Sequence, residues 1–457
     1  MSPNTRLQTP SPIQAPGPIG LQAWLRRPKT LRDQSITYLT MLWQTYGDIV
    51  RFRLGVDWIY MVVNPRHVRH ILFEQNANYG RDTRGFRALR PLFGNGLFTS
   101  VGNLWRHQRR IIQPTFHHDQ IKGFTATMID AAEQLIDRWA EPAGTGQVID
   151  MNFEMSTVAL QIVAETLFGS DIKNRIADIS RATAASTIYV GERALAPFEW
   201  TRIFPSAKKT IFEKARLLLE RTIDEIADQQ RLSTLQRGNL MSLLIDARDA
   251  ETGQPMSRQQ LRDEMLTFLI AGNETTAKLL TWAFYLLSQH PEVVARLRQE
   301  IAATVNGGRL TADDLPKLHL TRAVLEETLR LRPPVWRLAR SVDVADELDG
   351  FQIQKGSTVL LCAYLTHRHP DYWPDPERFS PDRFLSRDKA KRYDFFPFGA
   401  GPRICIGNHF ALTEALVVLA TVIQRYCPKL ATKEPIELLP KAVLEPKGGM
   451  PMRIEKH

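Results

Sequence analysis

The residue best suited to chemistry is Cys405, in the glycine-rich segment FFPFGAGPRICIG at residues 395–407. An amphipathic segment follows it, so the thiol stands just before an expected helix, where free backbone N–H groups and the helix dipole favour a thiolate. Gly399, Gly401 and Gly407 allow the backbone to turn tightly around the sulfur and to offer it N–H donors. The segment therefore predicts a sheltered sulfur anion.

A single metal bond is the chemistry that such a sulfur suits best. Arg403 adds a positive charge near it, and the other cysteines, Cys362 and Cys427, are expected in the core. No C-x-x-C pair and no evident histidine–acid pair accompanies Cys405, which favours a metal ligand over a nucleophile. A cysteine hydrolase that uses His409 and a merely structural cysteine remain as alternatives.

A second candidate site is AGNETT, residues 271–276, in the middle of a stretch at residues 262–287 that is apolar on nearly all sides. Such a stretch predicts a helix through the interior, and a glycine inside it costs about 1 kcal/mol, which indicates a function. Small residues there leave space for a flat cofactor and O₂, while Glu274 and Thr275 offer groups that handle protons. A packing seam with Glu274 paired to a basic residue is the alternative. The expected face carries Phe268, Ala271, Gly272, Thr275 and Leu279.

Two further pairs combine charge with helical spacing. Glu327 and Arg330 lie three residues apart, a spacing that permits an ion pair. Trp105 and Arg109 lie on one helix face, and an indole N–H together with a guanidinium suits carboxylates. Taken alone, each pair is equally typical of an ordinary helix surface.

Phe398-x-x-Gly401-x-Arg403-x-Cys405-x-Gly407 resembles the haem-binding signature of the cytochrome P-450 family, the haem-thiolate monooxygenases. AGNETT resembles the oxygen-activation motif of the same family. The resemblance implies a mainly α fold with a small β portion, in which a helical domain with short β-sheets sandwiches the haem. It also implies that Cys405 is the proximal iron ligand, whose thiolate pushes electron density onto the metal.

The same resemblance assigns roles to other residues. Thr275 and Glu274 are the expected catalytic pair, which delivers protons during oxygen activation. Glu327 and Arg330 are expected in a buried structural network, joined by Arg378 from the segment at residues 376–379. Haem b (iron protoporphyrin IX) is expected to contact Trp105, Arg109, Ala271, Gly272, Arg340, Phe398, Gly399, Arg403, Cys405 and Gly407, with Arg337 as a competitor of Arg340 for a propionate.

The implied reaction inserts one oxygen atom of O₂ into a hydrophobic substrate such as a fatty acid or terpenoid. Electrons are expected from NAD(P)H through a separate ferredoxin or flavodoxin and its reductase. These would dock on a basic tract that includes Arg106 and Arg110 and runs on to Lys122. A peroxide-driven enzyme and a non-catalytic haem-binding protein are the alternatives. The expected substrate-pocket residues are Phe86, Leu89, Phe268, Trp336, Leu338 and Met450.

Composition limits the remaining choices. The 457 residues are 43% hydrophobic and no Gly/Ser-rich linker divides them, so we predict a Pro-rich arm at residues 1–20 and one domain at residues 21–457. The net charge of +10 is spread over the chain without an aromatic–basic motif, which favours a protein partner over nucleic acid. No apolar run is long enough to anchor the chain in a membrane, so we expect a cytoplasmic protein, acting as a monomer.

Overall fold

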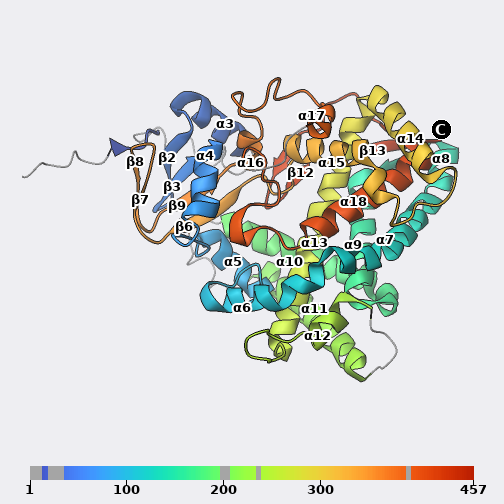
Figure 1. The fold of residues 1–457 in the computed structure, drawn as a ribbon, viewed down its shortest axis with the longest axis horizontal. Coiled ribbons are helices and arrows are strands. Elements are labelled where there is room, and N and C mark those ends of the chain that lie inside the picture. Colours follow the sequence, from blue (N-terminus) through green and yellow to red (C-terminus); the bar gives the residue numbers. More distant parts are fainter. Residues whose placement is uncertain (1–12, 19–34, 196–205, 233–237, 387–392, 457) are drawn as a thin grey trace, which may run out of the picture.

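Helices make up most of this computed structural model, which describes residues 13–18, 35–195, 206–232, 238–386 and 393–456 (Figure 1). The predicted fold class is confirmed, because long helices surround one another and the short strands gather mainly at one side of the molecule. In chain order, the helices of the first half are α3 (Ser35–Tyr46), α4 (Pro65–Arg69), α5 (Arg84–Phe93), α6 (Gly102–Ile112), α7 (His118–Arg138), α8 (Ala140–Thr145), α9 (Met151–Phe168), α10 (Ile176–Leu195) and α11 (Ala207–Leu232). The later helices are α12 (Leu240–Asp246), α13 (Arg258–Ser288), α14 (Pro291–Val305), α15 (His319–Leu331), α16 (Ala363–Thr366), α17 (Asp382–Leu385) and α18 (Asn408–Arg425).

The strands form four small sheets. In the largest, the order is β2 (Ile49–Leu54), β3 (Asp57–Val62), β9 (Thr358–Leu361), β6 (Leu338–Val342) and β4 (Tyr79–Gly80). Only the β3–β9 pair in this sheet is parallel, with Ile59 opposite Thr358. The smaller sheets contain β1 (Ile13–Gln14), β8 (Phe351–Ile353) and β7 (Asp346–Leu348); β10 (Tyr426–Leu430), β13 (Pro451–Lys456) and β5 (Val148–Asp150); and β11 (Leu438–Pro440) with β12 (Leu444–Pro446).

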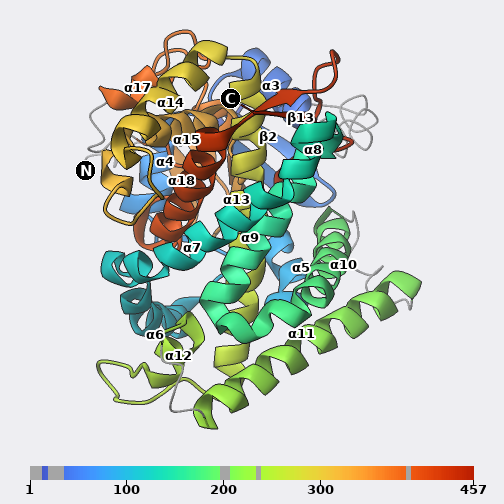
Figure 2. The same ribbon diagram turned by 90° about the vertical axis from the view of Figure 1, so that its right-hand side faces the viewer.

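The longest helix, α13, runs through the centre of the helical body, as its apolar sequence predicts (Figure 2). It begins after Ser257, whose hydroxyl caps it by accepting a hydrogen bond from the Gln260 N–H at 3.1 Å. Helices α9, α15 and α18 pack against it, so residues of α13 are buried along most of its length. The largest apolar core of the described chain is built around this helix.

The proposed N-terminal arm is described only at residues 13–18. There Ile13 and Gln14 pair in parallel with β8, and the Arg51 N–H donates to the Pro16 carbonyl at 2.8 Å. Gly17 lies so close to the Arg51 carbonyl that a Cβ there would be 1.7 Å from the oxygen. The rest of residues 1–20 lies outside the described residues, so the domain division stays a prediction. Among the described residues, no helix combines the length and the apolar character needed to cross a bilayer.

Candidate functional site

Cys405 lies between the short 3-10 turn at Gly401–Arg403 and the start of α18. Its backbone N–H donates to the Phe398 carbonyl at 2.9 Å, which closes the segment into a compact loop. The residue is accessible, yet protein atoms surround it closely enough that burial raises the pKa of its thiol, while the Gly407 N–H and the charge of Arg109 lower it. A metal ion would displace the proton and remove the cost of the buried anion.

Two glycines of this loop are required by its geometry. Gly401 has φ of +69°, and a Cβ there would lie 1.8 Å from the Leu72 carbonyl oxygen, so any side chain would push the loop away from its support. Gly399 has φ of +71° and faces Leu338, a predicted pocket residue. Gly407 has an ordinary φ of −89°, so its contribution is the N–H that points to the sulfur.

The loop lies close to the middle of α13. Phe116 connects the two, because its ring is 5.1 Å from the Phe268 ring and 4.0 Å from where a Cβ of Gly407 would be. One turn further along α13, Ala271 is exposed although most residues on either side of it are buried. The interior of the molecule therefore has an open face at Ala271, on the side of the helix that also carries Phe268.

Thr275 lies one turn beyond Ala271, and its hydroxyl donates to the Ala271 carbonyl at 2.8 Å. This bond leaves the lone pairs of the hydroxyl oxygen as acceptors at the open face. Gly272 differs from the prediction, since a Cβ there would meet Val163 of α9 at 3.2 Å. The glycine allows α9 and α13 to pack closely, and Ala271 is the small residue of the open face.

Glu274 is half-buried, and burial raises the pKa of its carboxyl. Lys278, one turn later on α13, opposes this effect, as does a hydrogen bond from Thr187 of α10. The carboxyl is therefore poised to bind and release a proton more readily than an ordinary surface glutamate.

Four arginines gather beside the Cys405 loop. Arg109 donates to the Ile404 carbonyl at 2.9 Å, and Arg403 donates to the Ser100 carbonyl at 3.0 Å. Burial and nearby guanidinium groups lower the pKa of Arg81 to about 9, of Arg403 to about 9 and of Arg340 to about 10. Arg81 was not predicted, because nothing in the segment NYGRDTRGF distinguishes it from a surface arginine.

This arginine cluster (Arg81, Arg109, Arg340 and Arg403) is short of counter-charge among the described residues, where the Cys405 sulfur is the anion that acts on it, through Arg81 and Arg109. In the described part of the chain, no aspartate or glutamate faces any of the four, and the Nε of Arg81 is buried without a hydrogen-bond partner. Buried cations are normally paired, so this donor set fits a ligand that carries more than one carboxylate. The two propionates of haem have this character.

Trp105 and Arg337 occupy different surroundings. The Trp105 ring lies under the Arg403 guanidinium, whose carbon is 3.8 Å from the ring centroid, so it belongs with the cluster. Arg337 instead lies 4.4 Å over the ring of Trp336 and is influenced by Cys362. This placement favours Arg340 over Arg337 as a carboxylate ligand.

The predicted ion pair of Glu327 and Arg330 is fully buried. Its two hydrogen bonds are 2.7 and 2.8 Å long, and both side chains have 0% exposure. The guanidinium also donates to the carbonyls of His367, Pro376 and Arg378 at 3.1, 2.6 and 3.1 Å.

The third arginine of this network was predicted wrongly. Arg378 contributes only its backbone carbonyl, and its side chain is exposed. Arg383, just inside α17, brings its Nε to 3.6 Å from the Glu327 carboxylate. Two similar segments, PERF and PDRF, follow each other here, and only the tertiary structure shows which of them faces α15.

The predicted pocket residues divide into two groups. Phe86 packs its ring 5.2 Å from that of Phe98, and Leu89 packs against the cluster that contains Phe93 and Ile270. Phe268 lies beside the open face of α13, and Leu338 lies beside Gly399. These side chains are partly accessible or close to the site.

Trp336 and Met450 do not fit the pocket prediction. Both have 0% exposure. Trp336 donates its indole N–H to the Lys441 carbonyl at 3.0 Å, within the core beneath α3. Met450 belongs to the main core, next to Asp150. Their apolar character is explained by packing alone.

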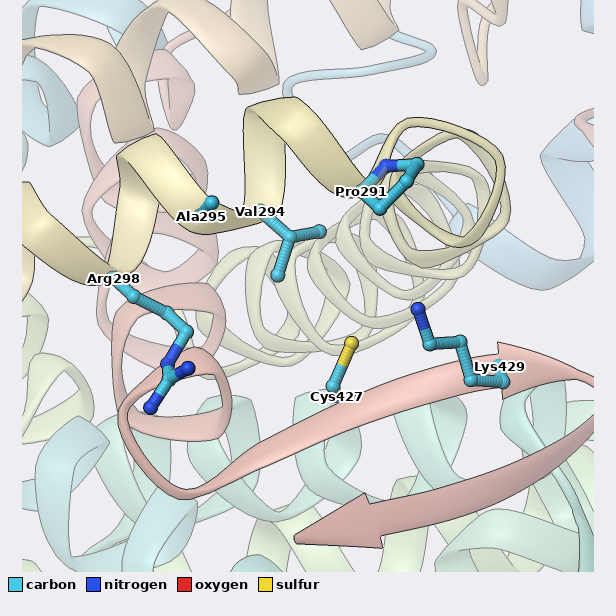
Figure 3. Close-up of a pocket in the computed structure, with 6 residues that line it drawn as sticks. All are labelled: Pro291, Val294, Ala295, Arg298, Cys427 and Lys429. Carbon is cyan, nitrogen blue, oxygen red and sulfur yellow. The ribbon is translucent and has the colours of Figure 1, made fainter. Parts of the chain in front are cut away.

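The other two cysteines, Cys362 and Cys427, have surroundings that differ from each other. Cys362 is fully buried, as predicted, whereas Cys427 is half-buried and lines a surface pocket between α14 and β10 (Figure 3). The pocket has a volume of about 170 Å³, below the roughly 300–1,000 Å³ usual for small-molecule sites. His409 is exposed and makes no hydrogen bond to Cys405 among the described residues, so the hydrolase alternative lacks its base.

A buried carboxyl on α18 was also missed. Glu414 has 0% exposure, and neither of its oxygens has a hydrogen bond of normal geometry, although Thr276 of α13 is its neighbour. Burial raises the pKa of this carboxyl well above its ordinary value, which favours its protonated form. In the sequence, Glu414 reads as one polar residue of an amphipathic helix.

Comparison with known proteins agrees with this geometry. The profile of the cytochrome P-450 family matches residues 12–452. Cyclooctat-9-en-7-ol 5-monooxygenase of Streptomyces melanosporofaciens is 36% identical over 419 residues, which cover 90% of this chain and 88% of the relative. Pentalenene oxygenase of Streptomyces avermitilis is 32% identical over 420 residues, or 90% of each chain.

A solved structure shows the same fold. The cytochrome P450DA haem domain matches with a TM-score of 0.87 over 98% of each chain, at 24% sequence identity, a level at which the likeness concerns the fold alone. The family profile and the relatives show a likeness in chemistry as well, since both match nearly the whole chain and the relatives include a named monooxygenase. The chain therefore belongs to the cytochrome P-450 family, whose members are haem-dependent monooxygenases.

Proposed function

We propose that this protein oxygenates an apolar, terpenoid-type substrate at the open face of α13, using electrons from a separate redox protein. The observation that carries the proposal is the position of Ala271, which is exposed, and Thr275, which is half-buried, in a helix whose residues are mostly buried, close to the Cys405 loop. Haem, when bound there, would supply the activation of O₂.

The residues of the chain would hold the haem and deliver protons. Cys405 would hold the iron, and the arginine cluster with Trp105 would hold the propionates. Phe398 and Gly407 would shelter the sulfur and orient it. Thr275 would accept a hydrogen bond from a water molecule, and Glu274 would pass protons to that water.

Two observations support a terpenoid over a fatty acid. Relatives with 36% and 32% identity are named for cyclooctat-9-en-7-ol and pentalenene. Arg87 and Arg90, on α5 with the predicted pocket residues Phe86 and Leu89, could receive a fatty-acid carboxylate, but they lie 3.5 and 3.9 Å from Asp82, which already offers them a counter-charge.

The test is a spectral screen of the haem-loaded protein. Terpene hydrocarbons and alcohols, fatty acids and steroids are added in turn, and the change in haem spin state is recorded. We expect the terpenes to shift the spin state at micromolar concentration and the fatty acids to fail. A response to fatty acids alone would contradict the proposed substrate class.

The docking face for the redox partner needs revision. Within the basic tract, Arg110 pairs with Asp249 at 2.7 Å and Glu251 at 2.6 Å, and His107 also faces Asp249 at 3.0 Å. Lys122 pairs with Asp313 at 2.8 Å. Arg106 is exposed and bonds only to Asn103 among the described residues, so it is the charge of α6 most available to an acidic ferredoxin or flavodoxin. We keep NAD(P)H as the electron source, and a cytoplasmic monomer as the working form.

Arg106→Glu is expected to slow reduction of the haem by an acidic ferredoxin about tenfold at low salt, because charge reversal weakens the encounter of the two proteins. The effect should shrink as ionic strength rises. Stopped-flow reduction measures it, with Lys355→Glu, an exposed residue between β8 and β9, as the charge-matched control. Equal rates for both variants would place the docking face elsewhere.

A further inference from the structure

Lys278 is a buried lysine that bonds to an amide oxygen and, within the described chain, to no carboxylate. It lies on α13 with 7% exposure, and its ammonium group donates to the Asn152 side-chain oxygen of α9 at 2.7 Å. Buried ammonium groups are normally held by a carboxylate at contact distance. Around Lys278, in the part of the chain that the structure describes, the carboxylates lie further away than an ion pair.

Three carboxylates act on the charge of Lys278. Glu274 precedes it by four residues and so lies one turn away on the same side of α13. Glu445 on β12 and Asp150 at the end of β5 also act on its charge. Lys278 is thus influenced both by Glu274 on its own helix and by acidic groups of β5 and β12.

Glu445 and its neighbour Lys441 are in contact with solvent. Glu445 pairs with Lys441 at 3.0 Å, and their side chains have 27% and 52% exposure. Glu274 feels this pair as well, since Glu445 raises the pKa of its carboxyl while Lys441 and Lys278 lower it. From α10, Thr187 adds only a hydrogen bond to Glu274. Glu445 and Lys441 thus act on both Lys278 and Glu274, and these ionisable groups form a cluster that reaches solvent.

We propose that Lys278 is a positioning residue that holds Glu274 ionised and through which Glu274 regains its proton from solvent beside the Lys441–Glu445 pair. The proposal rests on the proposed function, since it concerns the proton supply of that reaction. In the transfer, a proton leaves the Lys278 ammonium and reaches the Glu274 carboxylate through an intervening water molecule. The neutral amine then takes a proton from solvent, so charge and protons balance.

The electrostatics of Lys278 suit this role. Burial and the charge of Lys441 lower the pKa of its ammonium group, while Glu445, Glu274 and Asp150 limit the effect. A lysine held in a tight ion pair would keep its proton. The hydrogen bond to Asn152 fixes the side chain without adding a negative charge that would hold the proton on the ammonium group.

The first test follows the carboxyl group itself and needs no turnover. Infrared difference spectra of the haem-loaded protein are recorded against pH, and the C=O stretch of protonated Glu274 is assigned by its loss in Glu274→Gln. In Lys278→Met the band should persist to higher pH than in wild type, because the stabilising cation is gone. Lys278→Arg should restore the wild-type titration, and Lys355→Met should leave it unchanged. An unchanged titration in Lys278→Met would overturn the proposal.

The second test measures proton supply during turnover. Lys278→Met should form product roughly tenfold more slowly, a smaller loss than the 10²–10⁴-fold usual for removal of an acid–base group. Its solvent isotope effect should increase, and more of the NAD(P)H should be spent on hydrogen peroxide. Substrate affinity, from the spin-state shift, should stay unchanged. A lowered affinity with normal coupling would show a packing role instead and contradict the proposal.

Glu445→Gln provides a variant in the partly exposed part of this cluster of ionisable groups, where folding is least affected. It should also raise the peroxide yield and the solvent isotope effect, and a wild-type result would contradict the proposed route. The thiolate-type spectrum of the ferrous carbonyl form distinguishes a failure of the proposed function from a failure of the proton route. If wild type lacks it, the proposed function fails; if it is present and the Lys278 variants behave as wild type, only the proton route fails.

Discussion

Cys405→Ser is expected to reduce oxygenation to background and to remove the thiolate-type spectrum of the ferrous carbonyl form. Serine preserves the shape of the loop, including the bond from the residue 405 N–H to the Phe398 carbonyl. It does not preserve the soft anionic donor, because an alcohol loses its proton far less readily than a thiol and gives iron less electron density. The fold should survive, since the compact loop is held by backbone bonds and glycine turns.

The matched control is Cys427→Ser. This cysteine is half-buried in the small pocket beside α14, outside the site (Figure 3), so the same substitution there should leave both spectrum and activity unchanged. Absorption spectra of the reduced, carbon monoxide-treated proteins decide the matter. A thiolate-type spectrum that survives in Cys405→Ser would remove the basis of the site assignment.

Glu327→Gln is expected to lower the free energy of unfolding by about 3–5 kcal/mol, the usual cost of leaving a buried charge without its partner. Arg330 has 0% exposure, its other hydrogen bonds go to neutral carbonyls, and its guanidinium carbon lies 5.1 Å from the Trp373 ring centroid, so Glu327 is the carboxylate that compensates its charge among the described residues. The same carboxylate also receives the Ser380 N–H at 2.8 Å and lies near Arg383. Its loss therefore loosens the connection between α15 and the segment that leads to α17.

Urea unfolding followed by circular dichroism, with haem content measured in parallel, tests this effect. Glu292→Gln, an exposed change in the first turn of α14, is the control and should shift the unfolding free energy by no more than about 0.5 kcal/mol. We also expect Glu327→Gln to retain less haem, because the network lies between α15 and the chain that leads to the Cys405 loop. Equal midpoints for the two variants would contradict a structural role.

Much of the fold was predictable because long helices show a regular spacing of apolar residues in the sequence. Apolar spacing predicted α9, α13 and α18, and the alternating segments around Gly55 predicted β2 and β3. Helices α3, α5 and α10 were not predicted: α3 and α5 have only 12 and 10 residues, and α10 mixes apolar residues with small and polar ones. Their position depends on contacts with distant segments, such as α10 with α5 and α11.

By itself, the sequence determined the chemistry of the site, because a few residue types at fixed local spacing carry it. Cys405 with its glycines, the AGNETT turn and the Glu327–Arg330 pair each lie within a short segment whose geometry the backbone sets. Local hydrogen bonds and helical periodicity act over a few residues, so groups of this kind can be predicted from the sequence without knowledge of the fold.

Only the tertiary structure decided which charges meet across the interior. It added Arg81 to the arginine cluster, replaced Arg378 by Arg383 and brought Lys278 under the influence of both Glu274 and Glu445. It also moved Trp336 from the predicted pocket to the core. Side chains far apart in the chain meet through the packing of whole helices and sheets, and no local spacing encodes that packing, so identical arginines can be ligands, structural ions or surface charges.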